Sequence, residues 1–106
     1  MTEEELASCI AKDPNEDYLE KGLDFYFDSH SWNQANERAT KLVIPLAEFI
    51  ELHNFEKILE EASQNGEISH SHRFIDLMQI IREKGNISDK KFVNRVKKYG
   101  LERRIE

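Results

Sequence analysis

The sequence predicts an all-α fold, a compact single-domain bundle of about five to six helices. Three observations support this prediction: apolar residues recur at helical spacing, helix-capping residues precede most of the apolar segments, and strand or hairpin patterns are missing. A length of 106 residues fits one domain. We therefore expect residues 1–106 to fold as one unit, with 101–106 as a frayed tail or one more turn.

Two helices are expected in the N-terminal part. Residues 2–12 form a short helix that faces inward through Leu6 and Ile10. In the segment Asp13-Pro14-Asn15-Glu16, a capping residue precedes a proline at the first helical position and a glutamate at the third. A second helix is therefore predicted from this segment to about Asp28. Its inward stripe consists of Tyr18, Leu19, Leu23, Tyr26 and Phe27.

A long helix is predicted over residues 31–53. The capping box Ser31-Trp32-Asn33-Gln34 begins it, and Pro45 within it removes a backbone hydrogen bond and should kink it. Because the apolar stripe stays in phase across Pro45, one bent helix is favoured over two separate helices. The stripe consists of Trp32, Ala35, Ala39, Leu42, Val43, Leu46, Phe49 and Ile50.

Three more helices are predicted in the C-terminal half. The first contains Phe55 to Ala62 and ends at Asn65-Gly66. The second, residues 69–84, has apolar residues over so much of its circumference that it should be the central, mostly buried helix. The third, residues 88–99, is amphipathic. It has Phe92, Val93, Val96 and Tyr99 on one side, and Gly100 ends it.

Charge is sorted along the chain. Residues 1–28 carry nine Asp/Glu and two Lys, whereas residues 82–106 carry nine Lys/Arg and four Asp/Glu, in a chain of net charge −6. Such sorting gives a dipolar surface that can steer a partner or a second copy of the chain. The predicted acidic face consists of Glu16, Asp17, Glu20 and Asp24. The predicted basic face consists of Lys90, Lys91, Arg95, Lys97 and Lys98.

These faces suggest a non-enzymatic protein–protein interaction or adaptor module, which could self-associate through its acidic and basic surfaces. In size, helix count and charge layout the chain is similar to death-fold-type adaptor domains, a likeness at the level of fold that does not by itself establish function. Two alternatives remain. The basic helix 88–99 could make phosphate contacts in a small nucleic-acid-associated regulator, although the net charge of −6 disfavours a polyanion. The chain could also be a helical structural subunit of a larger complex.

A second candidate contact is aromatic. Phe25, Tyr26 and Phe27 are consecutive, and successive helical residues differ by about 100° in direction, so they cannot all face one core. Tyr26 and Phe27 continue the inward stripe. Phe25 is therefore expected near the rim, where it and Trp32 could form a contact patch for a partner.

No catalytic, cofactor or metal site is predicted. The sequence has no Gly-rich phosphate loop and no nucleophile elbow. His70 and His72 are the nearest pair of potential metal ligands, but two positions apart on a helix they point in different directions. As a calcium loop, the Gly66 segment has His72 where a bidentate glutamate is needed, and the Gly85 segment has Ile80, Arg82 and Lys84 at the first ligand positions, so calcium binding is not expected.

The composition predicts a cytoplasmic protein that does not enter a membrane. Cys9 is the single cysteine, so no internal disulfide can form. No apolar run approaches the roughly 18 residues of a membrane span. The start Met1-Thr2-Glu3-Glu4-Glu5 is acidic, unlike a signal peptide.

Overall fold

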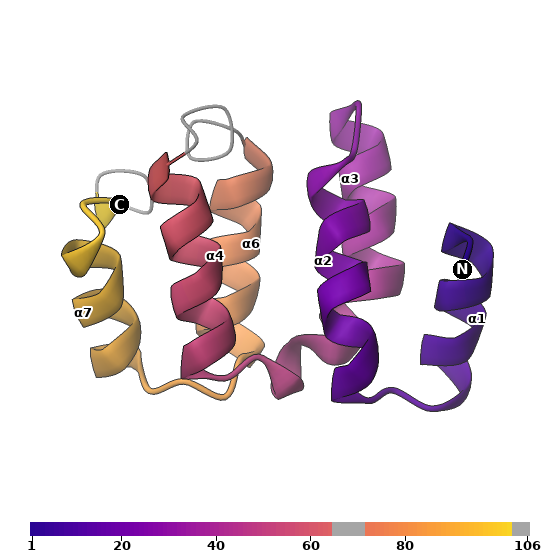
Figure 1. Cartoon of the computed structure of the whole chain (residues 1–106), viewed down its shortest axis with the longest axis horizontal. Coiled ribbons are helices and arrows are strands. Elements are labelled where there is room, and N and C mark those ends of the chain that lie inside the picture. Colours follow the sequence, from indigo (N-terminus) through magenta and orange to yellow (C-terminus); the bar gives the residue numbers. More distant parts are fainter. Residues whose placement is uncertain (65–71, 103–106) are drawn as a thin grey trace.

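Helices make up nearly all of the chain that the computed structural model describes, residues 1–64 and 72–102, and no strand occurs among these residues. The all-α prediction is therefore confirmed (Figure 1). In chain order the helices are α1 (Glu3–Lys12), the 3₁₀ turn η1 (Glu16–Tyr18), α2 (Leu19–Phe27), α3 (Trp32–Arg38), the π-helical η2 (Ala39–Val43), the 3₁₀ helix η3 (Ile44–Phe49), α4 (Leu52–Gln64), α6 (His72–Lys84) and α7 (Asp89–Lys98).

Side-chain caps fix the starts of several helices. Ser31 Oγ accepts a hydrogen bond from the Gln34 N–H at 3.1 Å, and Ser88 Oγ accepts one from the Lys91 N–H at 3.3 Å. Both starts were predicted. The start predicted at Asp13 is wrong, because Asp13 is the C-cap of α1 and Asn15 Oδ1 accepts from the Asp17 N–H at 2.8 Å.

The predicted long helix 31–53 is continuous from Trp32 to Phe49, but it changes type along its length. Pro45 has no N–H, and its ring would clash with the carbonyl one turn earlier in an α-helix. The chain accommodates this by widening into η2, where the Ile44 N–H donates to the Ala39 carbonyl, and then tightening into η3. Ile50 is extended and ends the segment, so residues 52 and 53 belong to α4.

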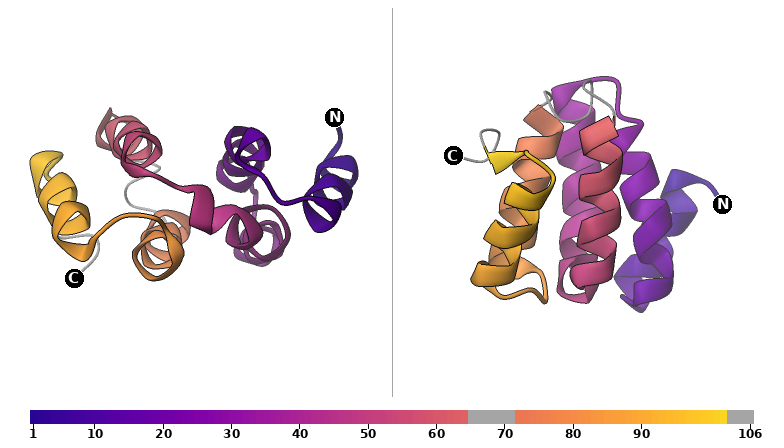
Figure 2. Two further views of the ribbon diagram at one scale, coloured as in Figure 1. Left: turned by 90° about the horizontal axis from the view of Figure 1, so that it is seen from below. Right: turned by 60° about the vertical axis from the view of Figure 1, so that its left-hand side comes forward.

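The helices form two layers around η2 and η3. Viewed from below, α2 and α4 lie in one layer and α3 and α6 in the other, while α1 and α7 close the two ends (Figure 2). η2 continues the helix of α3, and η3 leads from there between the layers to the start of α4 (Figure 2). The molecule is accordingly elongated and flat, with extents of 36 × 28 × 19 Å.

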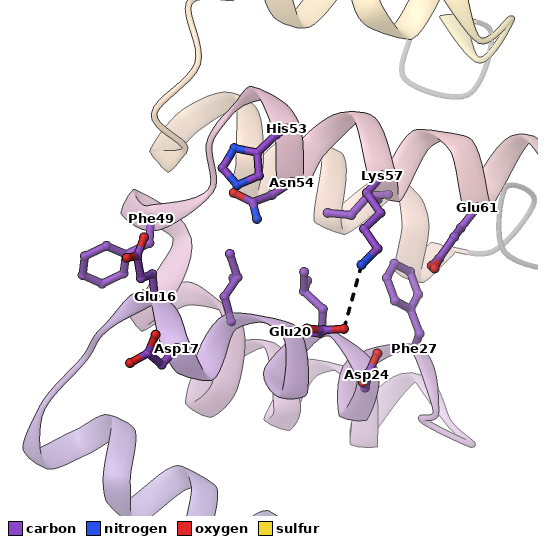
Figure 3. Close-up of a pocket in the computed structure, with 13 residues that line it drawn as sticks. Glu16, Asp17, Glu20, Asp24, Phe27, Phe49, His53, Asn54, Lys57 and Glu61 are labelled. Atoms are coloured by element: carbon purple, nitrogen blue, oxygen red, sulfur yellow. Dashed lines mark ion pairs between the residues drawn. The ribbon is translucent and has the colours of Figure 1, made fainter.

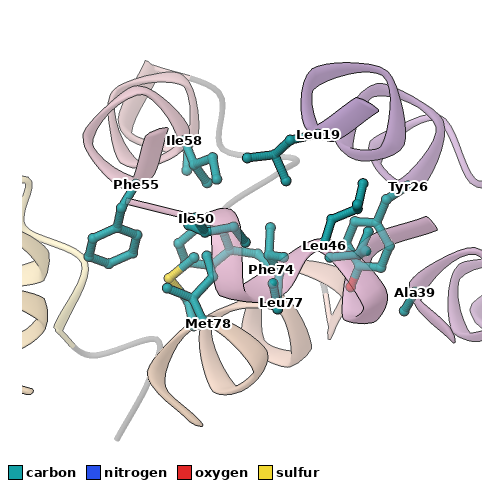
Figure 4. Close-up of a cluster of buried hydrophobic side chains, with 14 of the residues drawn as sticks. Leu19, Tyr26, Ala39, Leu46, Ile50, Phe55, Ile58, Phe74, Leu77 and Met78 are labelled. Carbon is teal, nitrogen blue, oxygen red and sulfur yellow. The ribbon is translucent and has the colours of Figure 1, made fainter. Parts of the chain in front are cut away.

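The core is centred on η2 and η3 rather than on the helix predicted over 69–84. Leu42, Val43, Leu46, Ala47 and Ile50 have no exposed surface. Side chains from both layers pack around this segment (Figure 4). α6 still buries one face against η3, through Phe74, Leu77, Met78 and Ile81.

The end of the described chain docks on this core. Gly100 has a φ of +69°, the left-handed conformation that ends α7. The Leu101 N–H then donates to the Val96 carbonyl at 3.0 Å, and the Leu101 side chain is buried. Only the later part of the tail expected at 101–106 lies outside the described residues.

Candidate functional site

A groove of about 410 Å³ lies between α2 and α4 (Figure 3). We call it the α2–α4 groove. Its acidic rim consists of Glu16, Asp17, Glu20, Asp24 and Glu61. Its apolar floor consists of Leu19, Leu23, Phe27, Phe49 and Ile58. His53, Asn54 and Lys57 of α4 complete the lining.

The groove exists because its two walls pack on different neighbours. α2 rests mainly on η2 and α3, whereas α4 rests mainly on α7. In the close-up the residue numbers rise in the same direction along both helices, so α2 and α4 run parallel (Figure 3). Each helix turns polar side chains outward and apolar ones inward, which gives a charged rim over an apolar floor.

The structure brings all four residues of the predicted acidic face to this rim. Glu16, Asp17, Glu20 and Asp24 are exposed and lie along η1 and α2. Glu61, which the sequence did not single out, joins them from α4. The groove therefore has five carboxylates against one lysine, a formal net charge of −4 with His53 neutral.

Lys57 reaches across the groove to the acidic rim. Its Nζ lies 3.9 Å from Glu20 Oε1, and both side chains remain mostly in solvent, at 69% and 81% exposure (Figure 3). An ion pair this exposed contributes between zero and about 1 kcal/mol. Glu20 is therefore readily available to a competing cation.

The apolar floor of the groove is continuous with the hydrophobic core and reaches the solvent. Leu19 and Ile58 are buried, while Leu23, Phe27 and Phe49 are half-buried and expose part of their apolar surface in the groove. Each was assigned to an inward stripe or apolar run in the sequence. The sequence did not indicate that these stripes from three elements meet at one surface, because that depends on how the elements pack.

The predicted basic face lies on α7, at one end of the molecule and on the other side of α4 from the groove (Figure 2). Lys90, Lys91 and Lys97 are exposed and form no ion pair with any described residue. Arg95 is different. Its Nε lies 2.6 Å from Glu56 Oε1 without hydrogen-bond geometry, and Lys98 Nζ lies 3.8 Å from the same oxygen.

α7 therefore uses part of its surface for contacts within its own chain. The Phe92 ring stacks on Phe55 with ring centroids 4.8 Å apart, and Arg95 faces α4. Of the five predicted basic residues, Arg95 is half-buried and the four lysines are exposed. The acidic and basic faces do not meet within one molecule, because α4 separates them (Figure 2).

The two candidate aromatic contacts do not share a patch. Trp32 is 62% exposed at the start of α3. Phe25 is half-buried, and the Arg38 guanidinium lies 5.6 Å from its ring centroid, while Arg38 Nη1 donates to the Phe25 carbonyl at 2.8 Å. Phe25 lines a separate hollow near Met1 that does not include Trp32.

Two sequence predictions remain, one on histidine metal ligands and one on membrane crossing. His72 is exposed at the start of α6, and His70 lies outside the described residues. Within residues 1–64 and 72–102, no three His, Cys, Asp or Glu side chains gather as a metal site. No helix in that part of the chain has the length and apolar character needed to cross a membrane.

The chain matches no protein-family model, no curated protein and no solved structure.

Proposed function

We propose that this chain is a non-enzymatic protein–protein interaction module that binds a positively charged protein segment at the acidic rim of the α2–α4 groove. One observation carries the proposal: the four acidic residues singled out in the sequence converge on a single groove with Glu61, and only Lys57 opposes them. An acidic surface of this kind speeds the approach of a positively charged partner and disfavours negatively charged ones.

The chain itself offers one surface of the required charge. Lys90, Lys91 and Lys97 on α7 are exposed, and the described structure pairs them with no carboxylate. A second copy could therefore place its α7 on the acidic rim, which is a head-to-tail contact. We expect that contact to be weak, because it brings charge without an apolar anchor.

A short lysine oligomer of about ten residues tests the proposal. Its binding is measured by fluorescence anisotropy for the wild type and for the rim variant Glu16→Gln/Asp17→Asn/Glu20→Gln/Asp24→Asn. Losing four exposed charges should weaken binding about tenfold or more, because each exposed pair contributes a few tenths of a kcal/mol to about 1 kcal/mol.

The matched control removes four charges elsewhere. Glu4→Gln/Glu37→Gln/Glu48→Gln/Glu83→Gln leaves the rim intact and gives the chain the same net charge as the rim variant; all four residues are exposed and outside the groove. The control should bind nearly as well as the wild type. Equal losses in the two variants would mean that total charge, and not this groove, attracts the oligomer, and the proposal would be wrong.

A further inference from the structure

The α2–α4 groove offers two kinds of contact, and a lysine oligomer uses only one of them. At the top of the groove, the acidic rim attracts cations. At its floor, three half-buried residues leave apolar surface within reach of a bound partner: Leu23, Phe27 and Phe49. A partner that uses the whole groove must present an apolar stripe flanked by basic residues.

We infer, on the basis of the proposed function, that the groove binds an amphipathic basic α-helix of another protein. Such a helix places its apolar stripe on the floor and its Lys/Arg residues against the rim on either side. This arrangement is the helix-in-groove mode of recognition, in which residues spaced three, four and seven apart anchor the helix.

The length of the groove sets the length of its occupant. The rim and floor extend from Glu16 to Phe27, twelve residues and therefore eleven steps along η1 and α2. At a rise of about 1.5 Å per residue this is roughly 17 Å, or about three helical turns. An occupant of about 11 to 14 residues therefore spans the groove.

The walls favour a helix over an extended strand. Recognition of an extended segment by strand addition requires an exposed sheet edge with unpaired backbone groups. The described residues contain no strand, and both walls of the groove are helices whose backbone groups bond internally. Affinity must then come from side-chain packing and charge, which an amphipathic helix supplies.

A second copy's α7 fits this groove poorly, although its charge is right. Of the apolar residues of α7, Phe92 and Val96 are buried in their own molecule and Val93 is half-buried, and Arg95 faces Glu56. A docked α7 would offer lysines to the rim but only part of one small apolar side chain, Val93, to the floor. The preferred occupant is therefore a helix from another protein.

Lys57 acts as the group that the occupant displaces. Its contact with Glu20 at 3.9 Å crosses the groove, and both side chains are exposed. A lysine or arginine of the bound helix can replace Lys57 beside Glu20 at little cost, because the exposed pair contributes no more than about 1 kcal/mol. Lys57 then turns to solvent.

Two labelled 14-residue peptides of identical composition test the inference against the full chain. In the first, leucines at positions 3, 6, 7, 10 and 14 form one helical stripe and the remaining positions are lysine and alanine. In the second, the same residues are shuffled so that the leucines are spread around the helix. The amphipathic peptide should bind at least tenfold more tightly, and its circular dichroism should show more helix when bound.

A third peptide keeps the lysines of the amphipathic peptide but interrupts its leucine stripe. Leucines 6 and 10 become asparagine, and its affinity should fall to that of the shuffled peptide. On the protein side, Leu23→Asn should reduce the preference for the amphipathic peptide, with circular dichroism used to confirm that the variant is folded. The peptide series needs no altered protein, so it decides the question even where a floor variant fails to fold.

The outcomes separate this inference from the proposed function. Equal affinity for the amphipathic and shuffled peptides would overturn the helix-in-groove inference, while rim-dependent binding of the lysine oligomer would leave the proposed function standing. If none of the basic peptides binds in a rim-dependent way, both are wrong. An affinity for the amphipathic peptide that is undiminished in the rim variant would also overturn the inference, because the site would then lie elsewhere.

Discussion

The backbone of α2 lies directly against the π-helical segment at Gly22, which faces the carbonyl oxygen of Leu42. A Cβ placed on Gly22 would come within 2.5 Å of that oxygen. Leu42 is itself fully buried, and it belongs to η2, the segment that Pro45 forces out of regular α-helical geometry. The absence of a side chain at Gly22 therefore allows α2 to lie close to the core, where it forms one wall of the groove.

Replacing Gly22 with alanine should destabilise the protein. Alanine favours a helix over glycine by about 1 kcal/mol, but overpacking against a buried carbonyl costs about 1–3 kcal/mol, so the net change should be a loss. Urea unfolding followed by circular dichroism measures it. Lys21→Ala, at the exposed neighbouring position, should stay within about 0.5 kcal/mol of the wild type. A Gly22→Ala variant as stable as the wild type would show that α2 can move away freely.

Removing the carboxylate of Glu56 should loosen α7. Arg95 and Lys98 both lie within 4 Å of its Oε1, and the Glu56 and Arg95 side chains are each 33% exposed. Glu56→Gln should cost about 1 kcal/mol, near the upper end for a partly exposed pair. Glu60→Gln, one turn further along α4 and exposed, is the control and should have almost no effect. Similar unfolding curves for the two variants would contradict this role of Glu56.

Stability should depend on pH through Asp89. Its Oδ1 accepts a hydrogen bond from Arg82 Nε at 2.7 Å, and this bond holds the pKa of Asp89 below its ordinary value. Because the pKa is lower in the folded state, the contribution is fully present above the unfolded pKa and disappears as pH falls through the folded one. The stability gap between the wild type and Asp89→Asn should therefore be constant near neutral pH and shrink below about pH 4. A gap that does not change with pH would count against this ion pair.

Neutralising Lys57 should strengthen the binding of basic peptides. Lys57→Gln removes the only lysine of the groove lining and frees Glu20 from its partner. Affinity for the lysine oligomer should rise about two- to fivefold at low salt, as expected for one exposed charge. The gain should shrink in 0.5 M salt because exposed charges are screened. Lys41→Gln, an exposed lysine outside the groove, serves as the comparison, and an equal gain there would point to net charge alone.

Head-to-tail self-association should be weak and sensitive to salt. At high protein concentration and low salt, sedimentation should report an average mass above that of the monomer, which returns to monomer in 0.5 M salt. Lys90→Glu/Lys91→Glu/Lys97→Glu should abolish the association, because these exposed lysines are the basic groups that α7 does not use internally. A wild type that is monomeric at every salt concentration would exclude α7 as a partner for the rim.

Much of the local structure could be predicted from the sequence because it depends on neighbouring residues. The capping residues Ser31 and Ser88 begin α3 and α7 as predicted. The apolar side of α7 is buried at Phe92 and Val96 because helical spacing places both on one face. The misplaced start at Asp13 shows the limit of such patterns, since Asn15, two residues later, is the residue that caps the helix start, by accepting from the Asp17 N–H.

The candidate site could be predicted only in part. The acidic residues Glu16 to Asp24 were evident because they are close in sequence on one helical stretch. Glu61 and Lys57 were not, because they come from α4 and face the rim only once α2 and α4 have packed on different neighbours. Arg95 looked like one of five equivalent cations, yet its position opposite Glu56 sets it apart.

The sequence by itself thus determined the all-α fold, the caps at Ser31 and Ser88, and the sorting of acidic and basic residues along the chain. These properties come from backbone propensity, side-chain capping and spacing, which act over a few residues. The tertiary structure alone decided that η2 and η3 form the centre, that Gly22 abuts Leu42, and that two distant helices enclose an acidic groove. Those relationships arise from close packing between segments far apart in the chain, where shape and volume, rather than local pattern, select the neighbours.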